Sequence, residues 1–112
     1  MNIYVIGPVT GKPNDNREEF ERVREELWAN PFNNAVMIPH DFADADSTWE
    51  QAMCQSILAM MQWWSYELSP NIPSQGFAIA MLDDWEESKG ARIEHDLAEA
   101  LGIECRPWRE WL

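Results

Sequence analysis

The chain has 112 residues, of which 46% are hydrophobic, and a formal net charge of −12. This length suits a single domain, 1–112, that buries roughly two-thirds of its unfolded surface, and the hydrophobic content excludes a disordered chain. The acidic balance argues against nucleic acid as a partner, because sequence-independent binding needs basic surface to release counterions. No apolar run approaches the ~20 residues that span a bilayer, so no membrane partner is expected either.

The charge and the cysteines suggest an ordinary intracellular protein. The many acidic residues between 18 and 26 are explained by solubility, and mimicry of nucleic acid that docks on a basic partner is the alternative. Cys54 and Cys105 are widely spaced and are expected to be reduced thiols. The first residues contain no basic segment typical of a signal peptide. A cytoplasmic location is therefore expected.

The first half of the chain predicts two strands separated by a helix. Residues 2–6 form a short β-rich run. Apolar residues at helical spacing then predict an amphipathic helix over 17–29, with Asn16 and Glu19 as a capping arrangement. Residues 35–38 form the second short strand.

The second half repeats this alternation. A capping box, Ser47 with Glu50, is expected to open a long helix with an apolar stripe. A strand over 76–82, a helix over 89–102 and a fourth strand over 103–106 complete the pattern. Strands that alternate with helices predict an α/β domain with a mainly parallel sheet of four to five strands, flanked by helices.

Ligands of such folds bind beyond the carboxyl ends of the strands. In this chain those ends lead into three loops rich in polar and turn residues, 7–16, 39–47 and 83–90. We therefore expect the three loops to meet at one edge of the sheet and to form a site there.

The run from Trp85 to Glu94 is the most informative pattern. Ser88 and Gly90 precede a helical pattern, and backbone N–H groups at a helix N-terminus attract phosphates and other anions. Glu94 lies one turn later on the inward face, and a carboxylate there usually has a function or a partner because its burial is unfavourable. It shares this face with three apolar residues, Leu97, Ala98 and Leu101.

Two loop patterns remain open. Gly7, Gly11 and Lys12 do not have the spacing of a Walker A motif, so the first loop is either a general anion-binding turn or a tight turn that needs positive φ. Trp85 at the mouth of the third loop either stacks on a flat ring or belongs to the core.

The second loop does not indicate a metal. His40 is followed by aspartates at 41, 44 and 46, but the sequence offers neither a second histidine at ligand spacing nor a calcium-loop pattern. A solvated loop with capping residues is the preferred interpretation, and no metal or cofactor is expected.

Two segments together resemble the nucleoside 2-deoxyribosyltransferase-like superfamily. They are Ile3-Tyr4-Val-Ile-Gly7-Pro8 and Leu82-Asp-Asp-Trp-Glu-Glu-Ser88-Lys-Gly90-Ala-Arg-Ile-Glu94. The likeness is strongest to a small branch that is common in phage genomes, for which a host cytoplasm would be the location. It covers nearly the whole chain in order and spacing, but it is poor in the middle.

The resemblance implies a flavodoxin-like fold and cleavage or transfer at the N-glycosidic bond of 2′-deoxynucleosides or their 5′-monophosphates. It implies that Glu94 is the nucleophile and that Tyr4 lies beside it. Ser88 matches a serine that helps to hold the phosphate in the related 5′-monophosphate glycosidases. The superfamily often forms homodimers, so a homodimer is expected here. Five further residues are candidates for contacts with substrate or phosphate: Gly7, Pro8, Trp85, Lys89 and Gly90.

The middle of the chain departs from the superfamily pattern. The resemblance implies a catalytic Asp on the second helix, but this chain has Ser56 at that position, and a hydroxyl is a poor general acid. Either another residue supplies the proton, with Asp83 and Asp84 as candidates beside Asp44 and Asp46, or turnover is slow. Ser56 itself either belongs to the site or is a small residue packed on a helix face.

Three functions therefore remain open. The first is a deoxynucleotide N-glycosidase or deoxyribosyltransferase that uses Glu94. The second is a nucleotide-binding protein of the same fold with little or no catalysis, such as a viral sponge or sensor. The third is an acidic protein-interaction module.

Overall fold

Four strands alternate with three α-helices in the computed structural model, which describes residues 1–112. The strands are β1 (Asn2–Ile6), β2 (Ala35–Met37), β3 (Phe77–Met81) and β4 (Glu104–Pro107). The helices are α1 (Arg17–Trp28), α2 (Trp49–Glu67) and α3 (Lys89–Ala100). Four short 3₁₀ helices accompany them: η1 (Pro13–Asn16), η2 (Pro39–Asp41), η3 (Trp85–Glu87) and η4 (Trp108–Trp111).

The strands form one all-parallel sheet in the order β2-β1-β3-β4. Tyr4 of β1 pairs in register with Met37 of β2 on one side and with Ile79 of β3 on the other. The prediction of an α/β domain with a parallel sheet is confirmed, and the arrangement is consistent with a flavodoxin-like fold. Each predicted strand is present, with ends that differ from the prediction by at most one residue.

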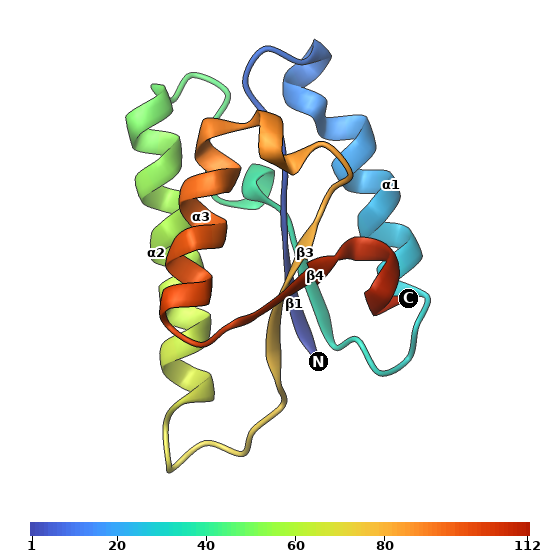
Figure 1. Cartoon of the computed structure of the whole chain (residues 1–112), viewed down its shortest axis with the longest axis vertical. Helices are drawn as coiled ribbons and strands as arrows, with labels where there is room; N and C mark the ends of the chain where they lie inside the picture. The colour runs from blue at the N-terminus through green and yellow to red at the C-terminus, as the bar shows by residue number, and fades with distance from the viewer.

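Helices cover both faces of this sheet. In Figure 1, α1 lies on one side of the strands, while α2 and α3 lie together on the other side. Alternation along β1 divides its side chains between the two faces, so Ile3 and Val5 join the cluster beneath α1, whereas Tyr4 and Ile6 join the cluster beneath α2 and α3. The sheet thus separates two hydrophobic interiors.

α1 follows the amphipathic pattern that the sequence predicts. Phe20, Val23 and Leu27 are fully buried against the sheet, whereas the neighbouring Trp28 is 52% exposed. Glutamates and arginines form ion pairs along the outer face, among them Arg22 with Glu19 at 2.7 Å. A stripe of apolar residues opposite a charged face is what an amphipathic helix on a sheet requires.

The last residues pack back onto the α1 side of the sheet. Trp108 of η4 is 2% exposed and belongs to the cluster beneath α1. Trp111 donates its indole N–H to the carbonyl of Ile79 at 3.0 Å. The C-terminal segment is therefore part of the core, and Figure 1 shows it beside α1.

Two predicted helix caps are wrong. α2 begins one residue later than the predicted box, because Thr48 and Gln51, not Ser47 and Glu50, form the reciprocal cap. Asn16 does not cap α1: it has left-handed backbone angles and its amide donates to the carbonyl of Pro8 at 2.8 Å. In both cases several residues that can cap a helix lie close together in the sequence. The backbone conformation of the preceding loop determines which of them is positioned to form the cap.

α3 ends at Ala100 and is therefore two residues shorter than the predicted range 89–102. Leu101 is 45% exposed and therefore does not share the inward face with Glu94, whereas Ala98 is fully buried as expected. Gly102 follows with φ +82°, a conformation that ends helices readily.

None of the helices combines the length and the apolar character that a membrane crossing would need.

Candidate active site

The loops at the carboxyl ends of β1, β2 and β3 surround a cavity of about 610 Å³. The first turns of α2 and α3 complete its walls. Figure 1 shows these loops gathered at one end of the molecule, away from the N-terminus. The crossover after β1 runs to the α1 face and the crossover after β3 runs to the opposite face, so the cavity lies where ligands bind in open parallel sheets.

A buried carboxylate forms part of the cavity wall. Glu94 of α3 is only 4% exposed, and its Oε2 accepts a hydrogen bond from the hydroxyl of Ser56 on α2. The hydroxyl of Tyr4 on β1 lies 2.5 Å from the same Ser56 oxygen. Three elements thus contribute to one hydrogen-bonded chain, Tyr4–Ser56–Glu94.

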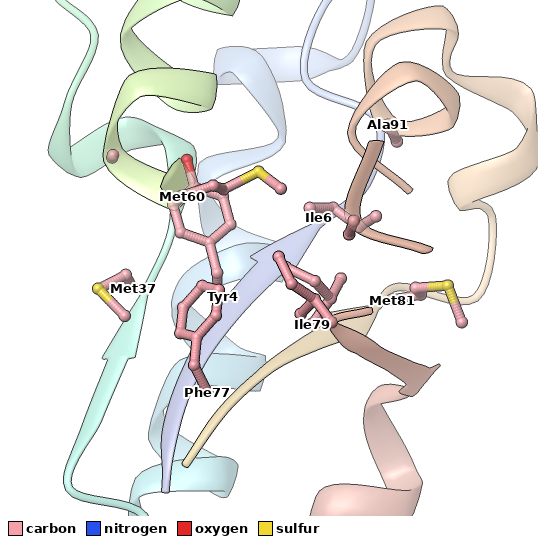
Figure 2. Close-up of a cluster of buried hydrophobic side chains, with 11 residues drawn as sticks. Tyr4, Ile6, Met37, Met60, Phe77, Ile79, Met81 and Ala91 are labelled. Carbon is pink, nitrogen blue, oxygen red and sulfur yellow. The ribbon is translucent and has the colours of Figure 1, made fainter. Parts of the chain in front are cut away.

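The fold positions each member of this chain. Tyr4 is the central residue of β1 and is fully buried; Figure 2 shows its ring rising from the strand, with the hydroxyl at the end near α2. Ser56 is 4% exposed on the inward face of α2, where its hydroxyl lies within hydrogen-bond distance of both Glu94 and Tyr4. The inward position of Glu94, expected from the helical spacing, is confirmed.

Burial changes the acidity of both ends of the chain. Desolvation raises the pKa of Glu94 from 4.5 to about 7, and the hydrogen bond from Ser56 counteracts this increase only in part. Desolvation, and next the nearby Glu94 carboxylate, raise the pKa of Tyr4 well above its ordinary range, so the phenol stays protonated. A carboxyl group that titrates near neutrality can act as a nucleophile, a base or an acid.

The N-terminus of α3 lines the same cavity through Ser88, Lys89 and Gly90. Ser88 caps the helix, because its hydroxyl accepts the backbone N–H of Ala91 at 3.1 Å. A Cβ on Gly90 would lie 2.8 Å from the sulfur of Met53, so glycine lets α2 and α3 approach here. The Lys89 ammonium lies 4.6 Å from the centre of the Trp49 ring, at the start of α2.

The first loop and the first residue of α1 bring one cation each to the cavity. Lys12 lies 3.2 Å from Asp84, and Arg17 lies 3.5 Å from Glu21, all with partly exposed side chains. Surface pairs of this kind contribute at most about 1 kcal/mol, so an anion could recruit either cation. Gly7 and Pro8 line the cavity as well. Gly11 has φ +87°, as the tight-turn interpretation requires.

The second loop is tied to the first. His40 donates its Nε2–H to the carbonyl of Asp15 at 2.7 Å, and both residues line the cavity. Asp41 instead pairs with Arg24 at 2.7 Å and accepts the backbone N–H of Ile38 at 3.0 Å. No group of three or more histidine, cysteine and acidic side chains is arranged to hold a metal ion.

The structure brings most of the predicted site residues together. The cavity wall contains six of them, namely Gly7, Pro8, Ser88, Lys89, Gly90 and Glu94, and Tyr4 reaches it through Ser56. Three other candidates lie outside the lining. Trp85 packs against the ring of His95, with centroids 4.3 Å apart, while Asp83 pairs with Arg109 and Asp84 with Lys12.

The bridging position of Ser56 could not be identified from the sequence. Its only signal is a hydroxyl in the apolar stripe of α2, and small polar residues also occur there as packing elements. Asp44 and Glu87 are further carboxylates of the lining, whereas Asp46 is not part of it.

Comparisons with known proteins give a single match. A search of curated proteins finds none that matches, and a search of solved structures finds none either. The model of one protein family, described as "Domain of unknown function (DUF4406)", matches residues 1–106. The chain, with its Tyr4–Ser56–Glu94 cavity, therefore belongs to the DUF4406 family.

Proposed function

We propose that this protein cleaves or transfers the N-glycosidic bond of 2′-deoxynucleosides or their 5′-monophosphates, with Glu94 as the nucleophile. The observation that carries the proposal is the Glu94 carboxylate, which is 4% exposed in the wall of a cavity of about 610 Å³. Ser56 holds Oε2, whereas Oε1 accepts no hydrogen bond within the protein. One carboxylate oxygen is thus fixed and the other is free to meet a sugar.

In the proposed reaction the ionised Glu94 attacks C1′ of the sugar, and the C1′–N bond breaks. The base leaves with the electron pair of that bond and takes up a proton. Water or the nitrogen of a second base then attacks C1′, loses a proton and releases the carboxylate. Two substitutions through a covalent intermediate replace one difficult step, as in retaining glycosidases.

The proton for the departing base has several candidate donors. Asp83 and Asp84, which the sequence suggested, are not part of the lining, and they pair with Arg109 and Lys12 respectively. Asp44 and Glu87 line the cavity instead. We therefore include these two carboxyl groups as the candidate acids.

The anion-binding end of the cavity supports a 5′-monophosphate as substrate. Ser88 and Lys89 lie at the N-terminus of α3, Lys12 reaches the same cavity from the first loop, and Arg17 reaches it from the start of α1. Helix N-termini favour phosphate, and a serine there avoids the repulsion that an acidic cap would cause. A nucleotide is therefore the proposed small-molecule partner.

A homodimer belongs to the proposal as well. Between Glu50 and Glu67 the helix α2 contains no charged residue, although the chain as a whole carries a formal charge of −12. This helix exposes Leu58 at 61% and Tyr66 at 52%. Two acidic copies can meet on a neutral surface without strong repulsion. Light scattering coupled to size exclusion would measure the mass in solution.

The test of the enzyme is release of free base. The protein is incubated with each of the four deoxynucleoside monophosphates and with the deoxynucleosides, and bases are separated by chromatography. We expect release by the wild type and a loss of at least about 10³-fold in kcat for Glu94→Gln. Glu86→Gln, which changes an exposed carboxylate outside the lining, is the matched control. Release that survives Glu94→Gln would contradict the assigned nucleophile.

Nucleotide binding without turnover is the second candidate. It is favoured by Ser56, whose hydroxyl stands where the resemblance implies an acidic residue, because the missing acid typically contributes ~10²–10⁴ in rate. Calorimetric titration with the same monophosphates distinguishes the two functions, since this candidate gives saturable binding and no free base. A protein that neither binds nor cleaves these compounds would favour the acidic interaction module.

A further inference from the structure

The hydrogen-bonded chain Tyr4–Ser56–Glu94 has a direction. An ionised carboxylate only accepts, so the single hydroxyl hydrogen of Ser56 points to Glu94 Oε2. The oxygen of Ser56 is then an acceptor, and the Tyr4 phenol, which stays protonated, donates to it. Each hydroxyl in the chain therefore supports a negative charge at Glu94.

No cation stabilises the negative charge of Glu94 in place of these hydroxyl groups. α2 has no charged residue between Glu50 and Glu67, and β1 contributes only Tyr4 as a titratable group. On α3, the Lys89 ammonium lies over the Trp49 ring. The other charged and titratable groups that line the cavity are Lys12, Asp15, Arg17, His40, Asp44 and Glu87. None of them forms a hydrogen bond or an ion pair with Glu94, whose only polar partner is Ser56.

We propose that Ser56 is a positioning residue whose hydroxyl favours the ionised form of Glu94 and holds its carboxylate in one orientation toward the cavity, with Tyr4 fixing the direction of that hydroxyl. The inference rests on the proposed function for its catalytic meaning. Ser56 does not touch the reacting atoms; it fixes Oε2, so that Oε1 is the oxygen presented to a ligand. A serine that only filled space would leave the titration of Glu94 unchanged.

The test is a titration of Glu94 that needs no substrate. Protein labelled with ¹³C at the glutamate carboxyl groups is followed by NMR as a function of pH, and Glu94→Gln identifies the resonance. Removing a hydrogen bond to a charged group should raise the midpoint of Glu94 by about one to two pH units in Ser56→Ala. Ser56→Thr, which keeps the hydroxyl, should restore most of the wild-type midpoint. Tyr4→Phe should raise it by less than Ser56→Ala does.

A serine elsewhere on α2 supplies the matched control. Ser65 is exposed, so Ser65→Ala should leave the midpoint of Glu94 where it is. Amide spectra of every variant report whether the fold is intact, and Ser56→Thr keeps the test interpretable if Ser56→Ala unfolds. An unchanged midpoint in a folded Ser56→Ala, or a midpoint in Ser56→Thr that matches the alanine variant, would overturn the proposal.

The outcome separates this inference from the proposed enzyme. If the midpoint rises in Ser56→Ala but the wild type releases no base, Ser56 has the assigned role and the glycosidase proposal fails. If the wild type releases base and the midpoint does not move, Glu94 acts without help from Ser56. In an active protein, Ser56→Ala should also move the acidic limb of the pH–rate profile upward by the same amount as the NMR midpoint.

Discussion

The interior between α1 and the sheet is closed by apolar side chains, whereas the interior beneath α2 and α3 contains a carboxylate and a hydroxyl. On the first side Phe20, Val23 and Leu27 are fully buried among aliphatic residues of the strands. On the second side Ser56 and Glu94 are each 4% exposed and hydrogen-bond to one another. The first side is arranged for stability, while the second retains a polar group that opposes folding at high pH.

The largest expected effect concerns the α1 side. Leu27→Ala should lower the free energy of unfolding by about 3–5 kcal/mol, because it removes a fully buried side chain and leaves a cavity. Its neighbour Trp28 is 52% exposed, so Trp28→Ala should cost less than about 1 kcal/mol. Urea denaturation of the two variants measures the difference. Equal losses would mean that α1 does not bury the face described here.

The next effect concerns Glu94 and depends on pH. Its pKa rises from 4.5 to about 7 on folding, so its contribution to stability is fully present below pH 4.5 and is lost as the pH rises through 7. Above pH 7 the buried charge should reduce stability by about 3 kcal/mol. Glu94→Gln should therefore be more stable than the wild type at pH 8.5 and about equally stable at pH 4.5.

Thermal unfolding at both pH values measures this effect. The exposed Glu86 provides the control, since Glu86→Gln should change stability little at either pH. A Glu94→Gln variant that is less stable at pH 8.5 would show that the carboxylate has a favourable partner in the folded protein. The interior beneath α2 and α3 would then stabilise the fold at high pH, as the apolar interior beneath α1 does.

Turnover should follow the same titration. A nucleophilic carboxylate must be ionised, so kcat/KM, which reports the titration of the free protein, should fall as the pH drops below 7, by about 50-fold between pH 7 and pH 5. A deoxynucleoside is the better substrate for this measurement, because it has no phosphate that titrates in the same range. A rate that is constant down to pH 5 would exclude Glu94 as a nucleophile with this pKa.

The smallest effect is at the N-terminus of α3. Ser88→Ala removes the acceptor of the Ala91 N–H and should cost about 1 kcal/mol in unfolding free energy. Ser88→Asp keeps a capping oxygen but adds a negative charge, so it should preserve stability while weakening the binding of a 5′-monophosphate relative to the nucleoside. Comparing calorimetric affinities for the two ligands measures this. Equal weakening of both would argue against a phosphate at this helix end.

Periodicity and turn residues were sufficient to predict most of the fold. Strand order along the chain, the amphipathic α1 and the inward position of Glu94 each depend on neighbours within one or two turns, so the sequence predicts them. The extent of α3 was overestimated, because Leu101 continues the apolar spacing but lies beyond the last helical turn. Whether an apolar residue at a helix end is covered depends on the next element, which local spacing does not reveal.

The site was predicted less completely, because its contacts join residues far apart in the sequence. Ser56 and Glu94 are 38 positions apart, and Tyr4 and Ser56 are 52 apart, so nothing local indicates their hydrogen bonds. Asp84 is adjacent to the candidate motif but pairs with Lys12 from another loop. The polar and turn residues in the loops at the carboxyl ends of the strands were sufficient to predict where the cavity lies. Which charged side chains pair with one another around it is visible only in the three-dimensional structure.

The position of η4 has a consequence for how this domain is delimited. The family model ends at residue 106, yet Trp108 is 2% exposed beneath α1 and the Trp111 indole binds a carbonyl of the central strand β3. A protein shortened to the family boundary would expose an apolar hole the size of an indole ring. We expect such a truncation to aggregate on expression, so a shortened version of this domain should retain the segment Trp108–Trp111.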